Sequence, residues 1–375
     1  MKNIALIGCT GSIGVQTLNV VRRHPDKFNI VSLSAGSNTS LLSEQIKEFR
    51  PKVVSSICEI EEKVSGVGYF FGENAFTNAI IPEADIVVVA LVGFKGILAV
   101  LDALEKGKNV ALANKESLVV GGALVTKLAK EKGLQILPID SEHSAIWQAL
   151  DFDFNKPFSK IILTASGGAF RDKTKEELEF VTAKDALKHP NWAMGAKITV
   201  DCATMVNKAF EVVEAKWLYG ADFDNINVII HRESIIHSMV EFMDGSTIAQ
   251  MSYPTMELPI SLALSYPNRI DCNLKSLDFA SLGKLTFEEM SIEKYPCFKT
   301  VIDSAKKGGV YPALINGAND RAVELFLKGK IKYTDIYKAL SFVVDTYKDN
   351  FTCDIKGLII ANNYAVKTVD GLFGV

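Results

Sequence analysis

The sequence has few cysteines, and none of them forms a CxxC pair. Six cysteines are scattered along 375 residues. This spacing argues against a zinc cage and a disulfide framework, and it is typical of a protein from a reducing compartment. We therefore expect a cytoplasmic protein.

Long hydrophobic runs and an excess of charge of one sign are also missing. The apolar stretch from Ile81 to Leu101 is interrupted by Glu83, Asp85 and Lys95, which favours a strand and a helix over a membrane span. The apolar residues Ile4–Ile7 are too few for a signal peptide. With a formal net charge of −3, the chain has no global field for nucleic acid or an anionic membrane, so an anionic ligand needs a local basic site. We expect neither nucleic acid nor a membrane as a partner.

Apolar strand-like runs alternate with helical patterns over residues 1–139. The predicted strands are Asn3–Ile7, Asn29–Ser34, Val53–Ser56, Asp85–Ala90, Val110–Ala113 and Gln135–Ile139, and the predicted helices are Gly14–Arg23, Ser40–Phe49, Gly96–Glu105 and Gly121–Lys132. Buried strands that alternate with helices indicate a parallel sheet covered on both faces. The expected fold class is therefore α/β, with a Rossmann-like domain at the N-terminus.

A glycine-rich turn follows the first of these strands. It reads Gly8-Cys9-Thr10-Gly11-Ser12-Ile13-Gly14 and opens the first predicted helix. Glycine lets the backbone approach a pyrophosphate, and a helix N-terminus offers unpaired N–H groups. Because the turn lies between the first strand and a helix of a repeated pattern, it favours a dinucleotide site over a turn without a ligand. The second strand ends in Ser34-Ala35-Gly36-Ser37-Asn38, where an NAD site has a carboxylate, and this favours NADP(H).

Two carboxylates follow the last strand of this region. If the strand Gln135–Ile139 continues through them, Asp140 and Glu142 point the same way and Ser141 points to the other side. Two like charges this close call for a cation, and hard oxygen donors suit Mg²⁺ or Mn²⁺. The alternative is a polar loop that caps a helix starting near Ser144.

The fifth strand is followed by Asn114-Lys115-Glu116, at the end of a parallel strand where ligands bind. Lys115 could contact an anionic substrate or assist proton transfer. Without its neighbours in space, Lys115 is better explained as a surface lysine.

Residues 140–265 have a different pattern, which includes a predicted flexible loop. The strand Lys160–Ala165 leads into Ser166-Gly167-Gly168, then into a charged amphipathic stretch, Lys173–Leu187, and the segment His189–Gly195. Glycines at one end and proline with glycine at the other predict a loop that opens and closes over a site. Trp192 is either its hydrophobic cover or a buried anchor.

A helix is predicted from Ala203 onward. Asn207, Lys208 and Glu211 share one of its faces because they lie three or four residues apart. This cluster could supply a third metal carboxylate and two anion contacts. An ordinary Lys–Glu surface pair is the simpler interpretation in the absence of a partner motif.

The remaining residues predict a small sheet, a connection and a helical bundle. The predicted strands are Val228–Ile230, Met239–Phe242 and Thr247–Met251, with a hairpin at Asp244-Gly245 and with His231, Glu233 and His237 near the sheet. We expect His237 to face either the site or a neighbouring subunit. Residues 266–308 are interpreted as an irregular connection. Three helices are predicted at Ala318–Lys328, Asp335–Tyr347 and Ile355–Val369, the last capped by Asp354 and ended by Asp370-Gly371.

Several blocks of residues, taken together, resemble one family. The blocks are GCTGSIG, NKESLV, PIDSEHSAI, TASGGAFR, HPNWAMG, DCATMVNKAFEVVEA and HRESIIHSMV. In this order they resemble the 1-deoxy-D-xylulose 5-phosphate reductoisomerases, enzymes of the non-mevalonate isoprenoid route. The resemblance implies an NADPH-dependent, divalent-metal-dependent rearrangement and reduction, through a retro-aldol and re-aldol sequence, that yields 2-C-methyl-D-erythritol 4-phosphate. It also implies a homodimer, an α+β catalytic domain with a flexible loop and a C-terminal helical bundle.

The resemblance assigns roles to individual residues. The implied metal ligands are Asp140, Glu142 and Glu211, for Mn²⁺ or Mg²⁺, with Co²⁺ as another possibility. The implied substrate contacts are Lys115, Ser141, Glu142, Ser166, His189, Cys202, Asn207, Lys208 and Glu211, and those on and beside the loop, with the helix, hold the phosphate. The implied NADPH contacts are Thr10, Gly11, Ser12, Ile13, Gly36, Ser37, Asn38, Asn114, Glu116 and Gly195. The catalytic candidates are Lys115, Asp140, Glu142, His189 and Glu211.

The chain departs from the family pattern at Cys202, where a serine is usual in the phosphate pocket. A thiol is a poor hydrogen-bond donor, so we expect a weaker phosphate contact unless a backbone group substitutes. The expected domains are an NADPH-binding domain at 1–139, a catalytic, metal-binding and dimerisation domain at 140–265, a connecting segment at 266–308 and a helical domain at 309–375. Two alternatives remain: another metal-assisted NADP(H) oxidoreductase of a phosphorylated or carboxylated substrate, and a non-catalytic nucleotide sensor.

Overall fold

A computed structural model describes residues 1–348 and 350–375, which form two compact units. The first unit consists of Met1–Ser117, Leu124–Ser144 and Thr255–Leu274. The second unit consists of Leu118–Ala123, Ala145–Pro254 and Lys275–Val375. The division of the sequence into four domains stays a prediction.

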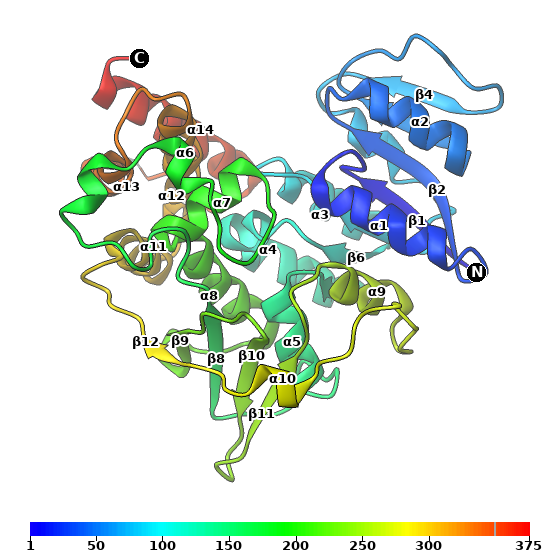
Figure 1. Cartoon of the computed structure of the whole chain (residues 1–375). Helices are drawn as coiled ribbons and strands as arrows, with labels where there is room; N and C mark the ends of the chain where they lie inside the picture. The colour runs from blue at the N-terminus through cyan, green and yellow to red at the C-terminus, as the bar shows by residue number, and fades with distance from the viewer. Residues whose placement is uncertain (349) are drawn as a thin grey trace. The chain divides into compact units, whose positions relative to one another are not determined.

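The first unit is built on a seven-stranded parallel sheet, part of which is drawn in blue in Figure 1. The strands are β1 (Lys2–Ile7), β2 (Phe28–Ala35), β3 (Val53–Ser56), β4 (Gly68–Phe71), β5 (Ile86–Val89), β6 (Asn109–Leu112) and β7 (Ile136–Pro138), in the order β4-β3-β2-β1-β5-β6-β7. The helices are α1 (Ser12–Arg23), α2 (Thr39–Phe49), α3 (Gly96–Glu105), α4 (Glu116–Lys132) and α9 (Glu257–Ser265), with a 3₁₀ turn, η1 (Ala75–Ala79). Residues Leu118–Ala123 of α4 belong to the second unit. The strand order reverses between β1 and β5, and in such sheets a crevice for ligands forms at that point, outside the carboxyl ends of the strands.

The predicted parallel sheet is confirmed, with two local differences. Strand β4 was not predicted, because its four residues are short and only partly buried and so carry a weak pattern. Helix α4 begins at Glu116 instead of Gly121. Gly121 is a kink inside it, with φ −135° and ψ 31°, and this glycine hides the helical pattern before it.

The second unit contains a five-stranded mixed sheet. Its strands are β8 (Lys160–Ala165), β9 (Ile226–Ile230), β10 (Ile236–Glu241), β11 (Thr247–Met251) and β12 (Glu288–Glu289), in the order β11-β10-β8-β9-β12. Only β8 and β9 pair in parallel among these described strands. The predicted hairpin at Asp244-Gly245 is confirmed: Gly245 has φ +83°, and Asp244 accepts a hydrogen bond from the Ser246 N–H.

Helices form the rest of the second unit. They are α6 (Ala183–Ala186), α7 (Ala196–Thr204), α8 (Val206–Tyr219), α10 (Phe279–Leu282), α11 (Pro296–Lys307), α12 (Tyr311–Leu327), α13 (Tyr333–Thr346) and α14 (Ile355–Phe373), with the short 3₁₀ turns η2 (Glu177–Phe180) and η3 (Phe223–Asn225). Helix α5 (Ser141–Ala149) begins in the first unit and ends in the second. Helices α12, α13 and α14 pack against one another as the predicted bundle, coloured orange to red in Figure 1.

Four predictions for the helices of the second unit are wrong in detail. The helix predicted at Ala318–Lys328 is α12, which begins seven residues earlier, at Tyr311. The helix predicted from Ala203 is two helices, α7 and α8, separated by Met205 with φ +61°. The predicted connection 266–308 contains helix α11. Asp354 caps α14 as predicted, since it accepts from the Gly357 N–H at 2.8 Å, but α14 runs past Asp370 and Gly371 to Phe373.

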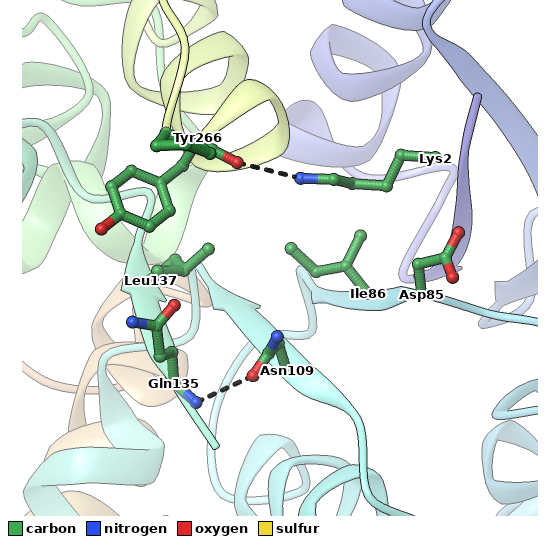
Figure 2. A pocket seen from close by; sticks show the side chains of 8 residues that line it. Lys2, Asp85, Ile86, Asn109, Gln135, Leu137 and Tyr266 are labelled. Carbon is green, nitrogen blue, oxygen red and sulfur yellow. Dashed lines mark hydrogen bonds between the residues drawn. The ribbon is translucent and has the colours of Figure 1, made fainter. Parts of the chain in front are cut away.

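A cavity of about 250 Å³ lies at the amino-terminal edge of the first unit's sheet (Figure 2). Lys2 at this edge donates from Nζ to the carbonyl oxygens of Leu264 at 2.7 Å and Tyr266 at 3.3 Å, which ties the end of α9 to the start of β1. The glycine-rich turn and Asp140 follow the carboxyl ends of strands, at the opposite edge. This cavity is therefore not the predicted site.

Within the described residues, none of the helices has both the length and the apolar character required to cross a bilayer. All six cysteines are thiols.

Candidate functional site

The glycine-rich turn after β1 is shaped by close backbone contacts. Gly8 has φ +96°, and a Cβ on it would lie 2.5 Å from the carbonyl oxygen of Ala90 after β5. A Cβ on Gly14 would lie 2.2 Å from the carbonyl oxygen of Gly8. A Cβ on Gly11 would have no neighbour closer than 3.4 Å, and this exposed glycine is the N-cap of α1. Because glycine has no side chain that could cap the helix, the first-turn N–H groups are left for solvent or an anionic ligand.

The residues after β2 combine exposure with a local structural role. Ser37 and Asn38 are exposed, and a Cβ on Gly36 would have nothing within 4 Å. Asn38 Oδ1 accepts from the Leu41 N–H at 3.2 Å and so caps α2. This edge of the sheet therefore has an open surface next to a helix N-terminus.

Asn114 and Glu116 hold the loop that follows β5. Asn114 is buried, and its Nδ2 donates to the carbonyl oxygens of Leu91 at 3.0 Å and Gly93 at 3.1 Å. Glu116 Oε1 accepts from the Gly93 N–H at 3.3 Å. The two side chains thus fix the loop beside the reversal of the strand order. Their direct contact with a nucleotide stays a prediction.

Lys115 is buried against Asp140. Its Nζ lies 2.5 Å from Asp140 Oδ2, and Lys115 is only 6% exposed. The two residues follow β6 and β7, which are neighbours in the sheet. The interpretation of Lys115 as a surface lysine is therefore wrong.

Asp140 and Glu142 do not lie on an extended strand, and that prediction is wrong. Strand β7 ends at Pro138, and α5 begins at Ser141, so Glu142 lies in the first turn of a helix, where its charge is favoured by the helix dipole. Ser141 links both carboxylates: its N–H donates to Asp140 Oδ1 at 3.0 Å and its Oγ donates to Glu142 Oε2 at 2.5 Å. A helix does begin here, as the alternative expected, but it begins at Ser141, three residues before Ser144, so Glu142 lies inside it and not in a loop that caps it.

In the second unit, Ser166 and His189 are hydrogen-bonded. Ser166 Oγ lies 2.9 Å from His189 Nε2, and His189 Nδ1 accepts from the N–H groups of Asn191 at 3.2 Å and Trp192 at 3.0 Å. Because Nδ1 is an acceptor, the neutral imidazole carries its proton on Nε2 and donates it to Ser166 Oγ. Burial, and then the charge of Arg171, lower the pKa of His189 from 6.5 to about 4. His189 is therefore neutral at pH 7.

The segment around Trp192 is attached to the turn between β9 and β10. Asn191 Nδ2 donates to the carbonyl oxygen of Arg232 and to Ser234 Oγ, both at 2.6 Å. Trp192 is half-buried, and its ring meets His237 edge-on with centroids 6.1 Å apart. Trp192 therefore has features of both a cover and an anchor.

Asn207, Lys208 and Glu211 form a buried cluster on α8. Asn207 Nδ2 donates to Glu211 Oε1 at 2.6 Å, and Lys208 Nζ donates to Glu211 Oε2. Lys208 is 4% exposed and Glu211 is 0% exposed. The shared face is confirmed, and the interpretation as a surface pair is wrong.

Gly195 and Cys202 belong to α7. Gly195 is its exposed N-cap, and Cys202 is half-buried in its last turn. A Cβ on Gly168 would lie 2.5 Å from the carbonyl oxygen of Cys202, so the turn after Ser166 packs against the end of α7. The phosphate role of Cys202 stays a prediction.

Comparisons with known proteins agree along the whole chain. Family profiles match at residues 4–122, described as 1-deoxy-D-xylulose 5-phosphate reductoisomerase, at 136–219, described as the C-terminal domain of that enzyme, and at 251–367, described as the DXP reductoisomerase C-terminal domain. The 1-deoxy-D-xylulose 5-phosphate reductoisomerase of Pelotomaculum thermopropionicum is 47% identical, with 100% of each chain covered. The chain belongs to the 1-deoxy-D-xylulose 5-phosphate reductoisomerase family.

Solved structures of reductoisomerases have the same fold. The enzyme from Zymomonas mobilis in complex with NADPH is 35% identical, with a TM-score of 0.92 and 99% of each chain covered. A DOX-P reductoisomerase in complex with NADPH, fosmidomycin and magnesium is 36% identical, with a TM-score of 0.95 and coverage of 100% of this chain and 98% of that one. The expected fold class is therefore confirmed.

Within this reductoisomerase chain, the structure connects site candidates that the sequence left separate. It pairs Lys115 with Asp140, and Ser166 with His189. Sequence reasoning missed Arg171, whose guanidinium donates to the carbonyl oxygen of Ser166 at 3.1 Å. The sequence signal that could have indicated this contact is the position of Arg171, five residues after Ser166 in the glycine-containing turn.

Both histidines near the second sheet are held by neighbouring groups. His231 Nε2 accepts from the N–H groups of Ile235 and Ile236, so its Nδ1 carries the proton donated to the carbonyl oxygen of Thr286 at 2.9 Å. His237 Nε2 lies 3.0 Å from Ser252 Oγ. We interpret His231 as a support of the turn between β9 and β10.

Proposed function

We propose that the chain performs the family's reaction with the residues described above. The chain is an NADPH-dependent, divalent-metal-dependent enzyme that converts 1-deoxy-D-xylulose 5-phosphate to 2-C-methyl-D-erythritol 4-phosphate in isoprenoid synthesis. One NADPH and one proton are consumed for each substrate, and NADP⁺ is released. The observation that carries the residue assignment is the burial of the Lys208–Glu211 pair, because a buried ion pair brings little net stability and is better explained by a site.

NADPH fits the edge of the first unit's sheet. The Thr10–Ile13 turn and the start of α1 offer backbone N–H groups to the pyrophosphate, and the contacts at Gly8 and Gly14 keep this turn close to the strands. Ser37 and Asn38 replace the carboxylate that would repel a 2′-phosphate. We assign Gly36, Asn114, Glu116 and Gly195 to the same cofactor by the family match.

A divalent cation fits Asp140, Glu142 and Glu211, whose donor atoms are all carboxylate oxygens. Such donors suit Mg²⁺ or Mn²⁺. When bound, the cation supplies Lewis-acid polarisation of the substrate's ketone and hydroxyl oxygens. Lys115 and Lys208 form ion pairs with two of these carboxylates, Asp140 and Glu211, and each ammonium group would be available to substrate oxygens beside a bound cation.

The phosphate of the substrate is assigned to the second unit. Ser166, His189, Cys202, Asn207 and Lys208 are its proposed contacts. Since His189 donates to Ser166 Oγ, the hydroxyl proton of Ser166 is directed away from the imidazole and toward a ligand. The segment that carries His189 would exclude water from the reacting carbons when it is closed.

The experiment measures NADPH absorbance with purified protein, 1-deoxy-D-xylulose 5-phosphate and Mn²⁺. We expect substrate-dependent oxidation that stops with EDTA. Oxidation of NADPH with a different phosphorylated substrate only would favour another metal-assisted oxidoreductase, and nucleotide binding without any oxidation would favour a sensor.

Two further proposals concern the state of the protein. We propose a homodimer, on family resemblance, and a cytoplasmic location, on six cysteines kept as thiols. Analytical ultracentrifugation tests the first proposal, since a sedimentation mass near 41.0 kDa would contradict it. Fractionation of cells tests the second.

A further inference from the structure

The guanidinium of Arg171 lies under the turn that carries Ser166. Its Nη1 donates to the carbonyl oxygen of Ser166 at 3.1 Å and to the carbonyl oxygen of Arg232 at 3.3 Å. The side chain is 19% exposed. This guanidinium is largely buried and donates to two backbone carbonyl oxygens, so it fixes the position of the segments that contain Ser166 and Arg232.

The backbone of the turn is adapted to this side chain. Gly167 has φ +82°, and a Cβ on it would lie 2.8 Å from Arg171 Cβ. Any other residue at this position would push the arginine stem off the turn. The sequence Ser166-Gly167-Gly168 therefore serves the packing of Arg171 as well as the freedom of a loop.

The carbonyl oxygen of Arg232 is shared between two segments. It accepts from Arg171 and, at 2.6 Å, from Nδ2 of Asn191, two residues after His189. One acceptor thus links the Ser166 turn to the segment that carries the imidazole. The Ser166–His189 hydrogen bond at 2.9 Å closes this ring of contacts.

Two residues next to the start of α11 also hold the turn that carries Ser166. Tyr295 Oη donates to the carbonyl oxygen of Gly167 at 3.2 Å, and Lys294 Nζ donates to the carbonyl oxygen of Arg171. The side chain of Arg232 pairs with Asp172 and Glu288 at the surface, and Asp172 Oδ2 also lies 3.7 Å from Arg171 Nε. This part of the predicted connection 266–308 therefore supports the turn.

We propose that Arg171 is a positioning residue for the substrate phosphate. Arg171 holds Ser166 and His189 at a separation that lets both contact one phosphate group. This inference rests on the proposed phosphate role of these two residues. Arg171 acts through them and through its charge, and it contacts no reacting atom.

The test compares Arg171→Gln and Arg171→Lys with Arg232→Gln as the matched control. Arg232→Gln removes a nearby guanidinium and its surface ion pairs but leaves the backbone carbonyl that Arg171 uses. Losing a hydrogen bond from a charged group costs about 10- to 100-fold in affinity. We expect Arg171→Gln to raise KM for the sugar phosphate, and the inhibition constant of inorganic phosphate, by about this factor, with KM for NADPH within about twofold of wild type.

Arg171→Lys keeps the positive charge but loses the planar set of guanidinium N–H donors, so its KM for the sugar phosphate should lie between those of wild type and Arg171→Gln. It also provides a folded variant if Arg171→Gln does not fold. Arg171 variants with wild-type KM and wild-type phosphate inhibition would overturn the inference, as would an Arg232→Gln effect as large as that of Arg171→Gln. A wild-type protein that does not oxidise NADPH would instead contradict the proposed function.

Discussion

The buried Lys208–Glu211 pair predicts a stability that responds to divalent metal. Lys208→Met keeps the aliphatic stem and removes the cation, which leaves the charge of Glu211 in a site with 0% exposure. Breaking a buried pair by removing one partner costs about 3–5 kcal/mol. The loss corresponds to a fall in Tm of roughly 6–20 °C for a unit of about 200 residues.

Mass action gives the stability that a divalent cation should restore to Lys208→Met. A cation bound by Glu211 in the folded state alone restores about 2.7 kcal/mol at a concentration 100 times its Kd. We therefore expect Mg²⁺ to raise the Tm of Lys208→Met more than that of wild type, because the variant has no ammonium that competes for the carboxylate.

Tryptophan fluorescence during urea unfolding measures this effect in the relevant part of the chain. All three tryptophans, Trp147, Trp192 and Trp217, belong to the second unit. The matched control is Lys328→Met, which removes a lysine that is 60% exposed and paired with Glu324 on α12, and it should cost only about 0.3–0.5 kcal/mol. Equal losses of stability in the two variants, or an equal effect of Mg²⁺ on both, would show that the Lys208–Glu211 pair is no more important than a surface pair.

Three other predictions concern the cofactor turn, the imidazole and the thiol. Gly14→Ala should destabilise the turn, because its Cβ would lie 2.2 Å from a carbonyl oxygen, whereas Gly11→Ala should fold normally; thermal unfolding and NADPH titration of both variants check this. His189 has a folded pKa of about 4, below its ordinary 6.5, so its contribution to stability is complete above pH 6.5 and is lost as the pH falls toward 4. Unfolding measured between pH 7 and 4 should show a loss of about 1–3 kcal/mol that His189→Asn removes, and an imidazole that titrates near 6.5 by NMR would contradict it. Cys202→Ser should lower KM for the sugar phosphate, since a hydroxyl is the better donor, and an unchanged KM would remove that idea.

The sheet of the first unit could be predicted from the sequence because its signals are local. Apolar runs alternate with helical patterns, and the turn Gly8–Gly14 marks the first of them. Helix α11 also carries local signals in the sequence, since Pro296 stands at its first turn and Gly308 follows its end. The break at Met205 had no such signal, because methionine is not a residue that favours positive φ.

The site itself was only partly predictable. The pattern predicts a strand through Asp140 and Glu142, although Asp-Ser-Glu is equally a helix start, and the structure has the helix. The burial of Lys115 could not be inferred, since its partner Asp140 comes from the next strand of the sheet. The shared face of Lys208 and Glu211 follows from helical spacing, but their burial depends on packing with distant segments.

We propose that Asp140 and Glu142, together with Glu211, which lies far from them in the sequence, bind one cation. The decisive measurement is a titration with Mn²⁺, followed by the loss of the electron paramagnetic resonance signal of the aquo ion. We predict one tight site in the wild type, and an affinity at least about tenfold weaker in Asp140→Asn, Glu142→Gln and Glu211→Gln, because each removes a charged ligand. Binding of Mn²⁺ by Glu211→Gln with wild-type affinity would show that Glu211 is not a ligand of this cation.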